Sequence, residues 1–219
     1  GLCHGIVGTR GFLARFIGKE PQKASVVAAG INHLTWILDF RIEGEDAYPL
    51  VRQERERSRD NMIAGKFKQE WFKHYYPISF KFFDIYGVFP SPGDVHVAEF
   101  YPYFLTKEAD GGKRYGLQQY PTGTIYESKW REAVWQRVKQ WSEPGSSLDE
   151  LWRRATPGER SLVMDMIMSL TRKETRIFEA VNIPNEGFVP NLPRGAIVEV
   201  PAAMGPPGTQ GLYVGDLPK

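Results

Sequence analysis

The feature that most constrains this chain is an alternation of side chains over residues 34–42, "LTWILDFRI". A two-residue period is typical of a β-strand with one buried face. The residues expected on that face are Leu34, Trp36, Leu38, Phe40 and Ile42. The preceding segment "SVVAAG", residues 25–30, predicts a short partner strand that ends at Gly30. His33 is therefore expected at the entrance of a strand.

Helical periodicity begins at Tyr48 and returns over residues 66–86, where Pro77 is expected to break or kink the helix. Between residues 127 and 141 one apolar stripe predicts a helix that faces the core. That stripe consists of Trp130, Val134, Val138 and Trp141.

Later segments mix helix, strand and loop. Thr156, with Pro157 and Glu159 after it, forms a capping box that predicts a helix over 161–170. Residues 195–202, "GAIVEVPA", predict a buried strand, and "AAMGPPGTQG", residues 202–211, predicts an exposed loop. Because helices and strands come without regular alternation, the expected fold class is α+β.

Composition excludes several classes of function. The 219 residues are 42% hydrophobic and carry a net charge of +2, which supports one core and argues against nucleic-acid binding. A single cysteine allows no internal disulfide, and no apolar run reaches the roughly 18 residues of a membrane span. We therefore expect a cytoplasmic protein with no membrane partner.

The residues able to carry chemistry lie in three segments. "GLCHGIVGT", residues 1–9, has the pattern of a strand and places Cys3 next to His4. Cys3 and His33 are thirty residues apart, a spacing that suits two strand ends meeting in space. A buried thiol and a hydrogen-bonded histidine would explain the same pair structurally. The turn-rich loop 87–94 leads to Asp94, with His96 and Glu99 close behind.

Successive blocks of the sequence resemble the family-4 glycoside hydrolases, the NAD- and manganese-dependent α-glycosidases. The blocks are "GLCHGIVGT", "AAGINHLTWILDFRIEGEDAYPLV", "GDVHVAEF" and "VNIPNEGFVPNLPRGAIVEVPA" with "VGDLP". The resemblance implies a fold like the C-terminal domain of lactate and malate dehydrogenases. It also implies that residues 1–219 form one metal- and substrate-binding domain, incomplete at both ends. No glycine-rich nucleotide motif is visible, so the Rossmann domain that binds NAD is expected upstream.

The resemblance also assigns roles to individual residues. It implies that Cys3 and His33 bind a divalent metal, typically manganese, although a soft thiolate suits zinc or iron better. Asp94 is implied to be the catalytic base, and His4 stands where relatives carry the acid that assists the leaving group. Asn32 and His96 are expected to bind sugar hydroxyls, while Glu99 fits a sugar contact or a structural salt bridge equally well.

The family mechanism is an oxidation and elimination, an exception to the two-carboxylate scheme of most glycosidases. NAD accepts a hydride from C3 of the sugar, a base removes the proton on C2, and the metal stabilises the resulting charge. The "Cys-His-Gly" form favours α-glucosidase or α-galactosidase activity. An α-glucuronidase or α-galacturonidase is the alternative, for which Arg10, Arg41 and Arg114 are candidate carboxylate ligands.

Other interpretations stay open at the level of sequence. Cys3 and His4 could form a nucleophile pair, although adjacent strand residues face opposite sides. The chain could be an inactive isolated half that acts as a scaffold, or a malate-dehydrogenase-like enzyme. The expected partners are a small sugar, a second copy of the chain in a dimer or tetramer, and a separate NAD-binding half.

Overall fold

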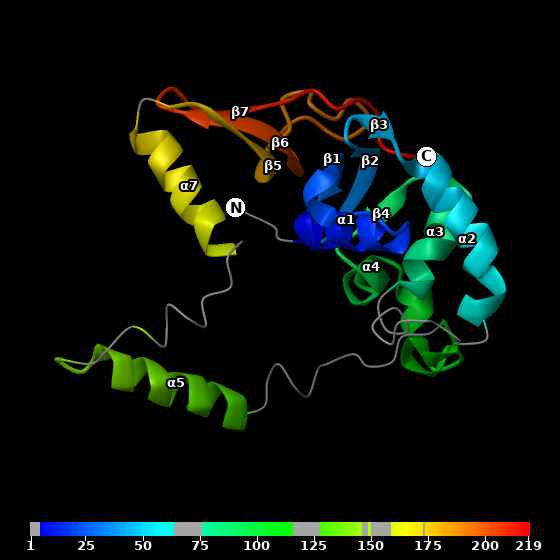
Figure 1. The fold of residues 1–219 in the computed structure, drawn as a ribbon, viewed down its shortest axis with the longest axis horizontal. Coiled ribbons are helices and arrows are strands. Elements are labelled where there is room, and N and C mark those ends of the chain that lie inside the picture. The colour runs from blue at the N-terminus through cyan, green and yellow to red at the C-terminus, as the bar shows by residue number, and fades with distance from the viewer. Residues whose placement is uncertain (1–4, 64–75, 116–127, 146–148, 150–158, 173) are drawn as a thin grey trace.

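The computed structural model describes residues 5–63, 76–115, 128–145, 149, 159–172 and 174–219. The first part of the chain contains α1 (Gly5–Phe16), η1 (Pro21–Lys23), β1 (Ala24–Ile31), β2 (Leu34–Ile42), β3 (Glu45–Asp46) and α2 (Tyr48–Ile63). The middle contains α3 (Pro77–Tyr86), β4 (Phe89–Ser91), α4 (Asp94–Phe100), η3 (Pro102–Leu105), η4 (Asp110–Tyr115) and α5 (Ser128–Ser142). The last part contains α7 (Glu159–Thr171), β5 (Arg176–Pro184), β6 (Ile197–Gly205) and β7 (Gly208–Gly211) (Figure 1).

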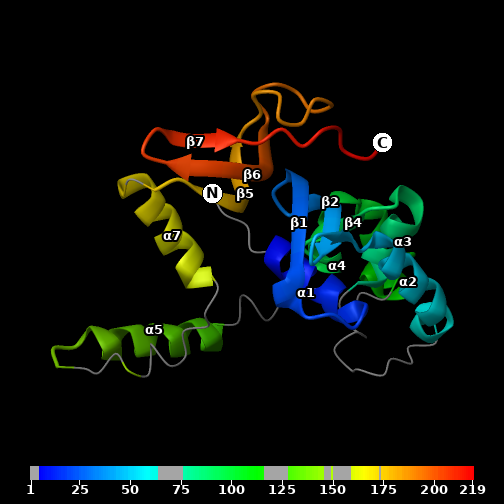
Figure 2. The same cartoon turned by 45° about the horizontal axis from the view of Figure 1, so that its top comes forward.

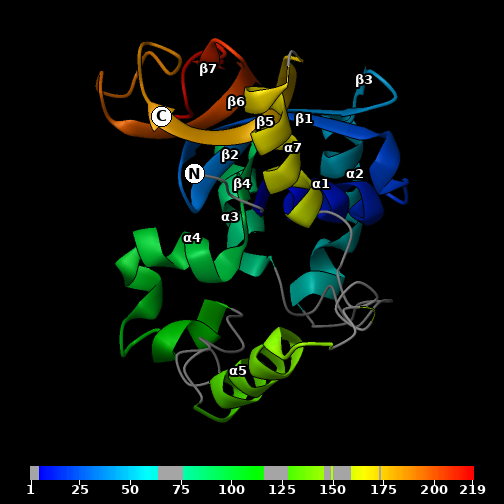
Figure 3. The same cartoon turned by 90° about the vertical axis from the view of Figure 1, so that its left-hand side faces the viewer.

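The strands of the described residues form one antiparallel sheet along the path β3-β2-β1-β6-β5. β4 pairs with β2, and β7 pairs with β6. Viewed from the side, α1 and α7 lie below strands β1, β5 and β6 (Figure 3). The expected α+β class is therefore confirmed.

The two halves of the sheet join at one residue pair, Gly30 of β1 and Glu199 of β6. Gly30 also lies tightly against β2, because a Cβ atom built on it would stand 2.3 Å from the carbonyl oxygen of Leu34. A larger residue at position 30 would therefore push β1 and β2 apart, which explains why this turn-proximal position is glycine.

The strand predicted over 34–42 is confirmed as β2, but the prediction of one buried face is wrong. The pairing with β1 shifts between Val27 and Ala28, which face Asp39 and Ile37, so Leu38 is an extra residue in β2. Such a bulge reverses the side-chain alternation. Trp36 consequently packs with α3 and α4, whereas Phe40 packs with α1, α2 and α3. Both faces of β2 are covered.

Two further predictions need correction. Residues 5–16 form helix α1 where the sequence suggested a strand, because Phe12, Leu13 and Phe16 pack together into the core. The segment 202–211 forms the end of β6 and all of β7, joined by a turn at Pro206 and Pro207, where an exposed loop was expected.

Helix α5 exists as predicted, yet it does not face the core. Val138 is exposed, and Val134 and Trp141 are only half-buried. Figure 2 shows α5 apart from the sheet, whereas α7 lies beside β5 and β6. Some of the helix predictions fall outside the described residues: the side chain of Trp130, residues 66–75 and the Thr156 capping box. Pro77, which was expected to break or kink a helix, begins α3. None of the helices in the described ranges combines the length and apolar character needed to cross a membrane.

Candidate active site

His33 occupies the tight turn between β1 and β2. Ile31 and Leu34 pair across the turn, so Asn32 and His33 are its two central residues. His33 has a φ of 69°, in the left-handed region that turns of this kind require at the second central position. A non-glycine residue held in that conformation stores about 1–2 kcal/mol of strain, a feature that clusters at functional sites. Asn32 is exposed beside it, where a small ligand can reach its amide.

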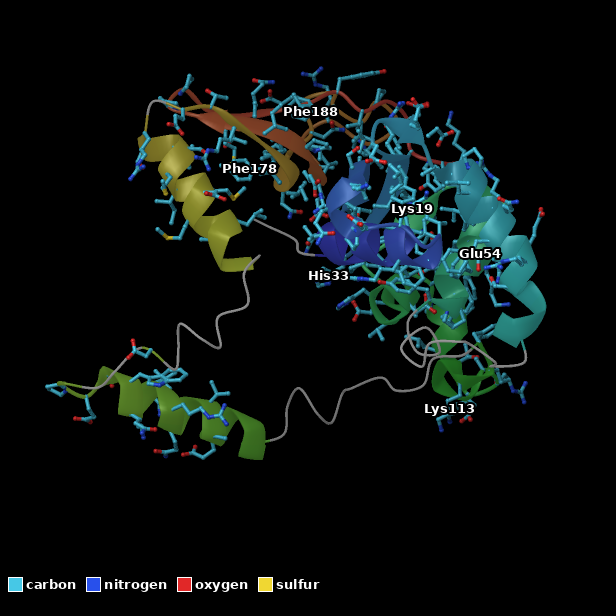
Figure 4. The ribbon with its side chains drawn as sticks, viewed as in Figure 1. Lys19, His33, Glu54, Lys113, Phe178 and Phe188 are labelled. Carbon is cyan, nitrogen blue, oxygen red and sulfur yellow. The ribbon has the colours of Figure 1, made fainter. Side chains whose placement is uncertain are left out.

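The second part of the site lies on helix α4. His96 and Glu99 are three residues apart, which places them on the same face of this helix. The Nδ1 atom of His96 is 3.6 Å from the Oε1 atom of Glu99, and the rings of His33 and His96 are 4.3 Å apart between centroids. One ligand atom from each of His33, His96 and Glu99 lies within 4.8 Å of the others. The turn and the helix thus bring together two imidazoles and a carboxylate (Figure 4 labels His33).

The protonation of this cluster favours metal binding. Burial and the neighbouring His96 ring lower the pKa of His33, while the charge of Glu99 acts in the opposite direction. His33 is therefore neutral at neutral pH, the form in which imidazole binds a metal. The Nδ1 atom of His96 is buried and has no hydrogen-bond partner among the described residues. The donor set and this orphaned atom fit a divalent cation.

Asp94 begins helix α4, but its carboxylate faces the N-terminus of α3 and is only 3% exposed. Oδ2 accepts a hydrogen bond from the backbone N–H of Ile78 at 2.6 Å. Oδ1 accepts hydrogen bonds from the N–H and the hydroxyl of Ser79 at 2.8 and 2.6 Å. In this conformation Asp94 is a buried cap of α3, and its predicted role as the base stays a prediction.

The other predicted groups fall in different places. Cys3 and His4 lie outside the described residues, so the predicted Cys3–His33 metal pair stays a prediction. Their neighbour Gly5 begins α1 next to the loop that precedes α4, since a Cβ atom built on Gly5 would stand 2.0 Å from the Cβ of Pro92. Thr9, one turn further along α1, hydrogen-bonds Ser91 through their hydroxyls at 2.9 Å. The start of α1, β4 and the approach to α4 therefore meet.

One buried acidic residue was missed by the sequence reasoning. Glu199 is fully buried in β6 and accepts a hydrogen bond from the side-chain amide of Asn182 at 3.1 Å. Its position opposite Gly30 places it in the strand pair that leads to the His33 turn. The sequence did contain a signal for Glu199, because an acidic residue between two valines in "VEVPA" is unusual for a buried strand.

Two of the candidate carboxylate ligands are already paired. Arg10 forms an ion pair with Glu179, and Arg41 forms one with Asp39 at 2.7 Å. Arg114, in η4, is exposed. These contacts give Arg10 and Arg41 structural partners within the chain.

The fold and the cluster define an α+β domain that can hold a divalent cation at one end of its sheet. The sequence profile of the family 4 glycosyl hydrolase C-terminal domain matches residues 28–219, and the chain therefore belongs to this family. This confirms the resemblance stated from the sequence. It also removes the support for a malate-dehydrogenase-like enzyme.

Curated relatives match the whole chain at modest identity. An α-galactosidase of Bacillus subtilis (strain 168) is 24% identical over 222 residues, which cover 100% of this chain and 46% of the relative. An α-galacturonidase of the same organism is 27% identical over 229 residues, covering 100% and 49%. The chain thus spans about half the length of these relatives.

Solved structures share the fold. A proposed glucosidase from Bacillus subtilis is 26% identical with a TM-score of 0.73, covering 100% of this chain and 50% of that one. A 6-phospho-α-glucosidase from gut microorganisms, in complex with NAD and Mn²⁺, is 15% identical with a TM-score of 0.63, covering 100% and 47%.

Proposed function

We propose that the protein formed with this chain hydrolyses α-glycosidic bonds, with a neutral hexoside of the α-glucosidase or α-galactosidase type as substrate. The observation that carries the proposal is the family match over residues 28–219. The α-galactosidase relative supports the choice of a neutral sugar. Because the chain spans about half of its relatives, the activity is assigned to a protein that also supplies an NAD-binding half.

The cofactors of the proposed reaction are NAD and a divalent metal such as Mn²⁺. A structure of the same fold contains both, and the cluster around His33 fits the metal. When bound, NAD supplies a hydride acceptor and the metal supplies Lewis acidity to the sugar oxygens. The residues proposed to hold the metal are Cys3 and His33.

The chain's own residues are proposed to orient the sugar and move its protons. Asn32, exposed beside His33, is proposed to bind sugar hydroxyls, and so is His96, whose ring contacts that of His33. Asp94 is proposed to take the proton from C2, a role that requires its carboxylate to turn away from α3. His4 is proposed to assist the leaving group as an acid or a hydrogen-bond donor.

A uronic acid substrate is the second candidate. The α-galacturonidase of Bacillus subtilis is 27% identical to this chain, and an α-galacturonidase of Thermoanaerobacterium saccharolyticum is 26% identical over 233 residues. Because Arg10 and Arg41 bind carboxylates within the chain, recognition of a uronate would fall to other residues.

The test uses the protein that contains this chain, with its NAD-binding half in the same polypeptide or supplied separately. Turnover of nitrophenyl α-glucoside, α-galactoside and α-galacturonide is measured under reducing conditions, with and without NAD and Mn²⁺. We expect turnover of a neutral α-hexoside that needs both additions. Cys3→Ser and His33→Ala should remove turnover together with its metal dependence, whereas the exposed Lys19→Ala control should not.

Three results would each contradict part of the proposal. Cys3→Ser and His33→Ala proteins that keep full metal-stimulated turnover would exclude the metal site. Absence of turnover on every glycoside, with no NAD binding by calorimetry in the presence of a Rossmann partner, would favour the non-catalytic scaffold. Inactivation by alkylation of metal-free protein would instead favour a Cys3–His4 nucleophile pair.

We also propose partners and a location for the protein. The exposed apolar side chains of α5 and α7 support a homo-oligomer. A single cysteine that must stay reduced to bind a metal supports a cytoplasmic location.

A further inference from the structure

We infer that His96 and Glu99 bind the same divalent cation as His33, so that the chain holds the ion with a two-histidine, one-carboxylate set. The inference rests on the proposed function only for the presence of a cation. It assigns His96 to the ion in place of the sugar hydroxyls expected from the sequence, and Glu99 to the ion in place of a salt bridge.

The distances between the three side chains fit coordination of one shared ion better than hydrogen bonds between the side chains themselves. The 3.6 Å between Nδ1 of His96 and Oε1 of Glu99 is long for a hydrogen bond. Two ligand atoms that each lie about 2.0–2.2 Å from one ion, at an angle of 90° to 110°, are roughly 3.0–3.6 Å apart. The ligand atom of His33 lies within 4.8 Å of both. One ion between them would also give the buried Nδ1 atom of His96 its missing partner.

Helix α4 is held so that these two side chains face the turn. Asp94 fixes the first residue of α4 to the N-terminus of α3, and Val97 and Ala98 are buried in the core. His96 and Glu99 occupy the other side of the helix, where His96 meets His33. Because both the turn and the helix are fixed by packing, the three ligands are positioned before any ion arrives, which is how metal sites gain affinity.

Adding His96 and Glu99 to the ligands resolves a mismatch in the assignment made from the sequence, in which Cys3 and His33 bind manganese. Manganese prefers oxygen ligands, and a thiolate together with one imidazole is a soft donor pair for it. A carboxylate and a second imidazole make the set harder and give it three protein ligands without Cys3. The ion can then be held in the absence of Cys3, while turnover still depends on the Cys3 thiolate as proposed above.

The test is Mn²⁺ binding by the full chain under reducing conditions, measured by electron paramagnetic resonance of free Mn²⁺ with no sugar or NAD present. We expect His96→Gln and Glu99→Gln each to weaken binding at least tenfold, as His33→Gln does. Cys3→Ser should weaken it by less than these. The matched control is Glu45→Gln, which removes an exposed carboxylate on β3 and should bind Mn²⁺ like the wild type.

A second measurement needs no variant. Paramagnetic Mn²⁺ should broaden the ring-proton signals of both His33 and His96 in the wild-type chain, at the same low metal concentration. Circular dichroism checks that the variants remain folded.

The outcomes separate this inference from the proposed function. Wild-type Mn²⁺ affinity in both His96→Gln and Glu99→Gln, with binding lost in Cys3→Ser, overturns the inference and leaves the glycosidase proposal intact. Weakened binding in both variants supports the inference even if no glycoside is cleaved. Unbroadened His96 signals beside broadened His33 signals would also overturn it.

Discussion

At the scale of single residues, the position of Asp94 was predicted correctly, but the contacts of its carboxylate were not. The sequence locates it after a turn-rich loop, close to His96 and Glu99, and this arrangement is observed. Its contacts with Ile78 and Ser79 join residues fifteen and sixteen positions away. No local pattern encodes such a contact, so the capping role could not be predicted. The nearness of His96 to His33 likewise depends on how α4 docks against β2.

Replacing Asp94 by alanine should destabilise the fold. Asp94→Ala leaves the N–H groups of Ile78 and Ser79 buried without acceptors, which we expect to lower the free energy of unfolding by about 1–3 kcal/mol at pH 5. Urea denaturation followed by circular dichroism measures the loss. The matched control is Asp84→Ala, which removes an exposed carboxylate from the same helix α3, where Asp84 forms an ion pair with Arg55. An equal loss in both variants would contradict the cap.

The same residue predicts a pH dependence of stability. Burial raises the pKa of Asp94 to about 7, against the lowering effect of its hydrogen bonds from Ser79 and Ile78. The unfolded carboxyl has a pKa of about 3.9, so the folded protein keeps a proton that the unfolded chain releases. This contribution to stability is complete below about pH 4 and is lost as the pH rises to about 7. Unfolding measured from pH 4 to pH 8 should show this decline in the wild type, and Asp94→Ala should show less of it.

At the scale of elements, the sequence predicted those whose periodicity is strong and missed those whose stability comes from packing. Strand β2, its partner β1 and helix α2 follow from local patterns. Helix α1 contains Gly8 and Gly11, which disfavour a helix, and it forms because its aromatic residues enter the core. Strand β7 is glycine-rich and is held by its pairing with β6. Tertiary contacts therefore determine that α1 and β7 form, and a single sequence does not reveal those contacts.

The connection from β5 to β6 is organised by Asn185, and its replacement should loosen that connection. The side-chain amide of Asn185 donates to the carbonyls of Val189, Leu192 and Pro193, and its oxygen accepts from two backbone N–H groups. Because Asn185 is 1% exposed, Asn185→Ala leaves these groups without partners. We expect a loss of about 2–3 kcal/mol in the free energy of unfolding.

Hydrogen exchange can show that the loss of stability in Asn185→Ala begins in the segment between β5 and β6. Backbone amides of residues 187–195 should exchange faster in Asn185→Ala than in the wild type. The matched control is Asn191→Ala, whose side chain makes two exposed hydrogen bonds to Leu217 and should cost less. Unchanged exchange in Asn185→Ala would contradict the organising role.

At the scale of the whole molecule, the apolar surface of α7 predicts self-association. Met166 of α7 packs on β5 and β6, whereas Val163, Met164, Ile167 and Leu170 are exposed. Trp135 of α5 is also exposed, at 55%. A charge on such a surface opposes its burial against a second copy.

Ile167→Glu should therefore shift the protein toward the monomer. Light scattering after size-exclusion chromatography measures the change in mass, and the control is Lys107→Glu in the exposed segment before η4, which should leave the mass unchanged. A wild-type protein that is monomeric at every concentration would contradict self-association.

Isotope incorporation distinguishes the proposed oxidation and elimination from direct displacement at C1. The complete protein, supplied with NAD and Mn²⁺, would cleave a neutral α-glycoside in D₂O, and the released sugar would be examined by proton NMR. Removal of the proton on C2 and its return from solvent predict deuterium at C2 of the product. Cleavage with the original hydrogen retained at C2 would contradict the account, because direct displacement at C1 leaves that bond untouched.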